Sequence, residues 1–233
     1  AHACFEWFYN RSNVNKNLGF ENYRFVEGYY DQFTDGEVAM DNLFLPSLID
    51  FYDAAKSESD KPYFSFSVSY QGHGPYSSER AYSEDFLKDN GYSEESYNIL
   101  NNYLGSIYNT NIYLTELIDH YRDIDEPVVF VVFGDHKPWM GDGNSVYNEL
   151  GINLDVSTDE GFYNYYSTPF FVWGNDAAKD ALGCDITGDA GSFSTCFLMG
   201  EIFDLFGWEG NEFMQVSRDI EQSIDVINTN GIY

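Results

Sequence analysis

The stretch that decides the fold is Val128-Val129-Phe130-Val131-Val132-Phe133-Gly134-Asp135-His136-Lys137-Pro138-Trp139. Its apolar, largely β-branched run predicts a buried strand that ends at Gly134. Ligands bind at the carboxyl ends of strands in open α/β sheets. There Asp135 offers an anionic oxygen and His136 an imidazole nitrogen, a combination that suits a divalent metal. The alternative is structural, because Asp after a strand also forms turns and caps helices.

A second strand and loop repeat this arrangement. Residues 63–70 predict a strand, and the glycine- and serine-rich loop after it carries His73. A long amphipathic helix is predicted from Ser93 to about Arg122. Strand, helix and strand form a βαβ unit, which predicts a parallel pair with a right-handed crossover. Both strand ends would then share one sheet edge, so His73 and His136 are expected in one site. An ordinary surface turn is the alternative for His73.

Other segments extend the α/β pattern. Residues 38–57 predict a helix in which Pro46 indicates a kink or a later start. Residues 168–173 predict a third strand, residues 193–206 another helix, and residues 23–26 a short strand. The connection 137–164 is long and rich in Gly, Asn and Asp, a length that is usually functional.

The charge of the chain restricts its partners. Its 233 residues include 39 acidic and 11 basic ones, a formal net charge of −28. Nucleic acid and anionic membrane surfaces are therefore excluded as expected partners, because both need a cationic protein surface. An acidic protein that handles an anionic substrate needs a local positive centre, which a divalent metal provides. The alternative is that the acidic residues serve only to keep the protein soluble. No apolar run is long enough to span a membrane.

The two ends and the cysteines add further expectations. The chain has no initiator Met and no signal-peptide pattern at its start, and residues 228–233 look cut within a longer protein, so we expect a piece of a longer chain. Cys4, Cys184 and Cys196 have no zinc-site spacing. A Cys184–Cys196 bridge and buried free thiols both remain open.

Several motifs in order resemble the lipoteichoic acid synthase family of the alkaline phosphatase and sulfatase superfamily. The matches are Phe8-Tyr9-Asn10-Arg11 with the family's Phe-Trp-Asn-Arg, Leu18-Gly19-Phe20 and Phe25 with Gly-Tyr-Asp-x-Phe, Ser69-Tyr70-Gln71-Gly72-His73-Gly74-Pro75-Tyr76 with Ser-x-His-x-Pro-Phe, Phe133-Gly134-Asp135-His136 with the metal motif Tyr-Gly-Asp-His, and Tyr166-Ser167-Thr168-Pro169-Phe170 with the strand that follows.

The resemblance implies an α/β fold of the alkaline phosphatase/sulfatase type, with a mainly parallel central sheet flanked by helices. Residues 1–233 would be the C-terminal portion of a single sulfatase-like catalytic domain. The implied activity is metal-dependent phosphoryl transfer, in which glycerol phosphate is taken from phosphatidylglycerol. The implied location is the extracellular face of a bacterial membrane, through an N-terminal anchor absent from this chain, or a secreted form.

The resemblance also implies roles for individual residues. Asp135 and His136 would bind the metal, Mn²⁺ or else Mg²⁺, Ca²⁺ or Zn²⁺. The phosphate and glycerol of a phosphoglycerol lipid, or of another anionic ester, would be held by His73 and Arg11, with His2 in the same pocket. The remaining candidates are Tyr9 and Cys4, which stand where the family has Trp and Asp, and Lys137, which could contact an anion or be solvated.

The family's threonine nucleophile and glutamate metal ligand would come from the N-terminal half of the domain, so the isolated chain is expected to be inactive. Two alternatives remain. The first is a sulfatase, phosphodiesterase or phosphonate hydrolase on the same scaffold, although no cysteine begins the sulfatase signature Cys/Ser-x-Pro-x-Arg. The second is a non-catalytic acidic binding fragment.

Overall fold

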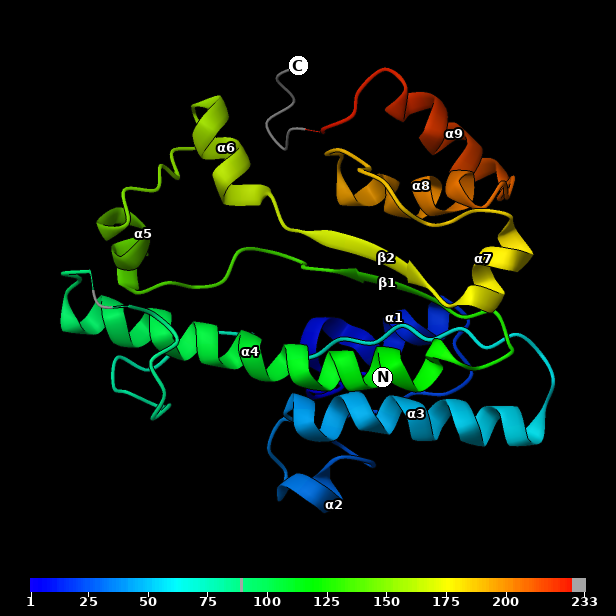
Figure 1. Cartoon of the computed structure of the whole chain (residues 1–233), viewed down its shortest axis with the longest axis horizontal. Helices are drawn as coiled ribbons and strands as arrows, with labels where there is room; N and C mark the ends of the chain where they lie inside the picture. The colour runs from blue at the N-terminus through cyan, green and yellow to red at the C-terminus, as the bar shows by residue number, and fades with distance from the viewer. Residues whose placement is uncertain (89, 228–233) are drawn as a thin grey trace. The chain divides into compact units, whose positions relative to one another are not determined.

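The computed structural model describes residues 1–88 and 90–227, which form two compact units (Figure 1). The first unit comprises Ala1–Tyr121 and Phe133–Pro169, and the second comprises Arg122–Val132 and the chain from Phe170 onward. The predicted cut at residues 228–233 lies outside the described residues. All three cysteines are free, so the Cys184–Cys196 bridge is not formed in this structure.

The first unit is built mainly from helices, and its long helices follow the sequence pattern. Helix α4 spans Glu94–Arg122, which confirms the predicted amphipathic helix. Helix α3 spans Asp41–Glu58 and contains Pro46, so the helix begins before the proline rather than after it. The shorter elements are η1 (Phe8–Asn10), α1 (Arg11–Asn17), α2 (Asp31–Thr34), η2 (Asp142–Asn144), α5 (Ser145–Glu149) and α6 (Asp159–Tyr166).

A core in the first unit joins α4 to the two loops that carry the predicted site. Tyr76 follows His73 by three residues, and Met140 follows His136 by four. Both side chains are buried against Ile99 of α4, together with Val146 and Tyr147 of α5. Burial of an Ile side chain contributes about 1.5–3 kcal/mol. The same apolar contacts that stabilise this unit therefore hold both loops on one helix.

Two predicted strands of the first unit are wrong. Residues 63–70 form only an isolated parallel bridge, between Val68 and His2, and residues 23–26 only one between Phe25 and Gly28. The backbone bonds of residues 63–70 to the start of the chain involve only Ala1 and Ala3, which pair with Phe66 and Val68, so no continuous ladder develops. The predicted parallel βαβ pair is accordingly not present among residues 1–88 and 90–227.

The second unit contains a two-stranded sheet of β1 (Val129–Phe133) and β2 (Phe170–Gly174), which confirms two predicted strands. The flanking bonds pair residue 128 with 175 and residue 134 with 169, so these two strands run antiparallel, whereas a mainly parallel sheet was expected. The predicted helix 193–206 is observed as η3 (Thr195–Phe197) followed by α8 (Leu198–Leu205). The other helices are α7 (Asp176–Leu182) and α9 (Glu212–Glu221).

Helix α8 covers one face of this sheet. Leu198 and Ile202 of α8, and Phe206 directly after it, pack against alternate residues of both strands, Val129 and Val131 of β1 and Phe170 and Val172 of β2. Alternate residues point to the same face of a strand, so this cluster is the core of the second unit. Within the described ranges, no helix combines the length and apolar character needed to cross a membrane.

Candidate functional site

The turn that presents the predicted metal ligands is held at Gly134, directly after β1. The Gly134 N–H donates to the carbonyl of Pro169 at 3.1 Å, and the hydroxyl of Thr168 donates to the Gly134 carbonyl at 2.7 Å. A Cβ at Gly134 would lie 3.2 Å from the Cβ of Thr168. Glycine thus allows the two chains to approach closely, and the two bonds set the direction in which Asp135 leaves the strand.

Asp135 and His136 turn their ligand atoms toward each other. Oδ2 of Asp135 lies 3.6 Å from Nε2 of His136, and both side chains are exposed. Nδ1 of His136 lies 2.8 Å from the Lys137 carbonyl. A carbonyl only accepts, so Nδ1 carries a proton, and in the neutral imidazole Nε2 then has a free lone pair. Two ligands bound tetrahedrally at about 2.1 Å from one metal lie about 3.4 Å apart, which is close to the observed distance.

The structure brings His73 beside this pair. The rings of His73 and His136 lie 5.9 Å apart at 86°. His73 also stacks on Tyr70, with ring centroids 4.9 Å apart. Nδ1 of His73 contacts the Gly74 carbonyl at 2.5 Å, which leaves Nε2 as an acceptor by the same reasoning. Tyr70 was not predicted as a site residue, since no local pattern distinguishes it from the other aromatic residues.

A second cluster in the first unit contains His2 and Arg11. The His2 ring is buried, stacks on Phe25 at 5.3 Å and meets Phe66 edge-on at 5.9 Å. The guanidinium of Arg11 lies over the same Phe66 ring, 5.8 Å from its centroid. Nε2 of His2 lies 3.2 Å from the side-chain nitrogen of buried Asn15, another contact that the sequence did not indicate. A shared aromatic ring therefore brings His2 and Arg11 together.

The environment of this cluster disfavours a charged His2. Burial lowers the pKa of His2 to about 4, and the positive charges of the amino terminus and of Arg11 act in the same direction. Cys4 is also buried, which raises the pKa of its thiol. Both side chains are consequently neutral near pH 7, and Arg11 is the cation of the cluster.

The remaining predicted site residues are Tyr9 and Lys137. Tyr9 in η1 is 77% exposed, with its backbone in the left-handed region at φ 54°. Lys137 is half-buried and accepts the bond from His136 through its carbonyl. The segment 66–73 carries contacts to both clusters, since Phe66 touches His2 and Arg11 while its last residue is His73.

The two clusters do not amount to a complete metal site. Within residues 1–88 and 90–227, no group of three or more His, Cys, Asp or Glu side chains is arranged to hold a metal ion. Asp135 and His136 fit a metal in donor chemistry and spacing, but they supply only two ligands.

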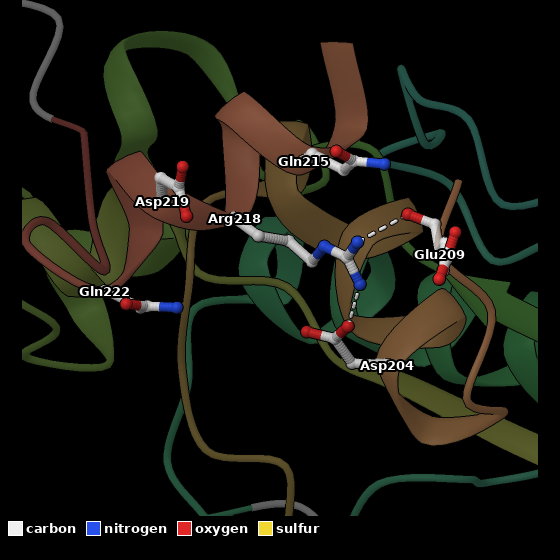
Figure 2. A pocket seen from close by; sticks show the side chains of 6 residues that line it. All are labelled: Asp204, Glu209, Gln215, Arg218, Asp219 and Gln222. Carbon is white, nitrogen blue, oxygen red and sulfur yellow. Dashed lines mark hydrogen bonds and ion pairs between the residues drawn. The ribbon is translucent and has the colours of Figure 1, made fainter. Parts of the chain in front are cut away.

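A surface hollow of about 530 Å³ lies elsewhere, in the second unit (Figure 2). Its cation is already engaged, because Arg218 pairs with the carboxylate of Asp204 and donates to the carbonyl of Glu209. None of the predicted site residues lines this hollow. The full lining is Asp204, Glu209, Gln215, Arg218, Asp219 and Gln222.

A family model and a solved structure each match most of the chain. The family model described as Sulfatase matches residues 1–208. A relative from Rhizobium meliloti (strain 1021), named "Putative cyclic beta-1,2-glucan modification protein", is 28% identical over 209 residues, which are 87% of this chain and 30% of the relative. The solved structure of Streptococcus pyogenes phosphoglycerol transferase GacH in complex with sn-glycerol-1-phosphate superimposes with a TM-score of 0.69 at 16% identity.

The superposition covers 98% of this chain and 54% of the GacH chain. The chain therefore spans roughly a third to a half of the length of these two proteins. The likeness confirms the alkaline phosphatase/sulfatase-like fold class that the motifs implied.

Proposed function

Because the chain belongs to the sulfatase family, we propose that it is part of a metal-dependent phosphoglycerol transferase. Enzymes of this superfamily carry out ester and phosphoryl transfer. The finer proposal is that glycerol phosphate is taken from a phosphoglycerol lipid such as phosphatidylglycerol. The enzyme would act on the extracellular face of a bacterial membrane, anchored through another part of the protein, or after secretion.

One observation carries the proposal, the convergence of Asp135 Oδ2 and His136 Nε2 at 3.6 Å. The Lys137 carbonyl orients the imidazole so that its lone pair faces the carboxylate, as in protein metal sites. For the ion we propose Mn²⁺, which the family resemblance implies, with Mg²⁺, Ca²⁺ and Zn²⁺ as alternatives, because a carboxylate suits Mn²⁺, Mg²⁺ and Ca²⁺ and an imidazole suits Zn²⁺. When bound, a divalent ion would polarise the phosphoryl group and neutralise negative charge on it.

The other side chains would hold the substrate. Nε2 of His73 is free to accept a hydrogen bond from a glycerol hydroxyl, and its ring lies beside His136. Arg11 would donate charge-assisted hydrogen bonds to the phosphate. Such local cations are needed because the chain as a whole, at a net charge of −28, repels anions.

Cys4 would contribute no charge to the head-group pocket, since burial keeps its thiol neutral. Tyr9 offers an aromatic surface with an added hydroxyl, and its side chain is exposed. These two departures from the lipoteichoic acid synthase pattern support, as a second candidate, a sulfatase, phosphodiesterase or phosphonate hydrolase on the same scaffold.

The nucleophile is expected outside this chain, in the N-terminal half of the catalytic domain, together with a glutamate ligand. We therefore expect the chain alone to show no turnover. For the acceptor we propose a carbohydrate, because the Rhizobium relative is named for modification of a cyclic glucan. A neutral glycan also avoids the repulsion that an anionic acceptor would meet.

The test is a calorimetric titration of the chain with Mn²⁺. The site variant carries Asp135→Asn and His136→Ala. The matched control carries the same two changes at Asp119 and His120, an adjacent, exposed Asp-His pair on α4. We expect the binding heat to disappear in the site variant and to persist in the control. Equal binding by both variants would refute the metal site.

The two enzyme candidates are separated by substrate in the longer protein. Release of glycerol phosphate from phosphatidylglycerol, without cleavage of an aryl sulfate, would support phosphoglycerol transfer. The reverse preference would support the sulfatase. Mn²⁺ binding with no turnover of either substrate by the longer protein would favour the acidic binding fragment.

A further inference from the structure

Gln71 connects the loop of His73 to two helices through its side chain. Its Oε1 accepts from the backbone N–H of Asp41 at 3.0 Å, and its Nε2 donates to the carbonyl of Ser106 at 3.1 Å. The backbone carbonyl of Gln71 accepts from the Ser106 hydroxyl at 2.7 Å. One end of the amide meets a donor and the other an acceptor, so only one orientation of the side chain satisfies both.

The groups that hold Gln71 are themselves buried and connected. Asp41 is the first residue of α3, and its N–H is one of those that a helix leaves without an internal partner. The Asp41 carboxylate, fully buried, accepts from Thr110 at 2.6 Å. Thr110 and Ser106 lie one turn apart on the same face of α4. The start of α3, the middle of α4 and Gln71 thus form one hydrogen-bonded unit.

A tight turn connects Gln71, which is bonded to both helices, to His73. The N–H of His73 donates to the carbonyl of Tyr70 at 2.8 Å, which makes Gln71 and Gly72 the central residues of a β-turn. The Gly72 carbonyl also accepts from the hydroxyl of buried Tyr76. The orientation of this turn sets where the His73 ring stands, between Tyr70 and His136.

We propose that Gln71 is a positioning residue for the substrate site, which holds the turn 70–73 so that His73 stands beside His136. This inference rests on the proposed function, in which His73 contacts the substrate. Gln71 would not touch the substrate itself, because both ends of its amide are engaged with the helices. Its contribution is to the affinity for the glycerol phosphate group.

The test uses Gln71→Met, which keeps the side-chain length and removes both amide bonds. The control is Gln215→Met, an exposed glutamine on α9 in the second unit. The chain has four histidines, so the ring signals can be assigned by NMR with His73→Ala as reference. We expect Gln71→Met to shift the His73 signals while those of His2 and His120 stay in place. The control should move none of them.

In the longer protein, we expect Gln71→Met to weaken binding of sn-glycerol-1-phosphate by about tenfold, the equivalent of one to two hydrogen bonds. The melting temperature should fall by no more than it does in Gln71→Glu, which keeps the acceptor for Asp41 but places a carboxylate against the carbonyl of Ser106. Unmoved His73 signals, or displacement of all four histidines together, would overturn the positioning role.

Two further results keep the inference separate from the proposed function. If the wild-type protein does not bind glycerol phosphate, the substrate assignment fails, while the NMR displacement still decides whether Gln71 positions His73. If Gln71→Met does not fold, Ser106→Ala decides instead, because it removes only the bond to the Gln71 carbonyl. We then expect a smaller shift of the same His73 signals, and no shift would overturn the inference.

Discussion

Asn175 is the polar residue whose removal should weaken the second unit most. The residue is 1% exposed, and both the oxygen and the nitrogen of its side-chain amide are hydrogen-bonded. Oδ1 accepts from the N–H of Ala178 at 2.9 Å, which caps α7, and from the N–H of Val128 at 3.0 Å. Nδ2 donates to the carbonyls of Ile124 at 3.0 Å and Glu126 at 2.9 Å. One side chain therefore joins a helix start to the backbone that enters β1.

We predict that Asn175→Ala lowers the free energy of unfolding by about 4 kcal/mol. Loss of a helix N-cap costs about 1 kcal/mol. Each of the other three bonds adds about 1 kcal/mol, the typical net contribution of one hydrogen bond to stability. The N–H of Asn175 still donates to the Val128 carbonyl in the variant, so the register at the start of β1 is retained.

Asn211→Ala is the matched control. Asn211 caps α9 by accepting from the N–H of Met214 at 3.0 Å, and it is exposed. Its loss should cost about 1 kcal/mol, the value of the cap alone. Urea unfolding followed by the fluorescence of Trp173 and Trp208, both in the second unit, measures each change. A difference between the variants below about 0.5 kcal/mol would refute the additive value assigned to the three long-range bonds.

Two other predictions concern the first unit. His2 has a pKa of about 4 when folded and 6.5 when unfolded, so the unfolded chain binds the extra proton between these values. Stability should therefore be fully present above pH 6.5 and fall by about 3 kcal/mol as the pH drops to 4. Urea titrations at several pH values should show a flatter profile for His2→Gln, and parallel profiles would contradict the assignment. Gly161→Ala would place a Cβ 2.1 Å from the Asp155 carbonyl oxygen, which is rigid backbone. We expect a loss of about 3 kcal/mol in a thermal melt, against less than about 1 kcal/mol for Gly200→Ala, whose neighbour is the flexible Arg218 stem; equal losses would exclude the clash.

Local pattern was sufficient for the elements on which the proposed site rests. The apolar run that ends at Gly134 predicted β1 and the turn with Asp135 and His136, and helical periodicity predicted α4. Both signals are carried by residues close in sequence, so they can be read from a single segment of the chain. The order of the motifs was likewise enough to recognise the fold class, although each motif is short.

The pairing of strands was not readable in the same way. Residues 63–70 have the alternation of a strand but form only the bridge with His2. Strand assignment needs a partner with continuous hydrogen bonds, and a single segment does not reveal its partner. His73 and His136 still lie together, but the burial of Tyr76 and Met140 against α4 accounts for it rather than a shared sheet edge.

The sequence by itself determined the strand that ends at Gly134, the long helix and the order of chemically suited residues along the chain. Only the tertiary structure decided which polar groups meet. Gln71 bonds to Ser106, which is 35 residues away in sequence, and Asn175 bonds to Val128, which is 47 residues away. No local sequence pattern around Gln71 or Asn175 indicates these partners. Buried amides are satisfied by whatever backbone the fold brings near them, so these contacts are a consequence of packing.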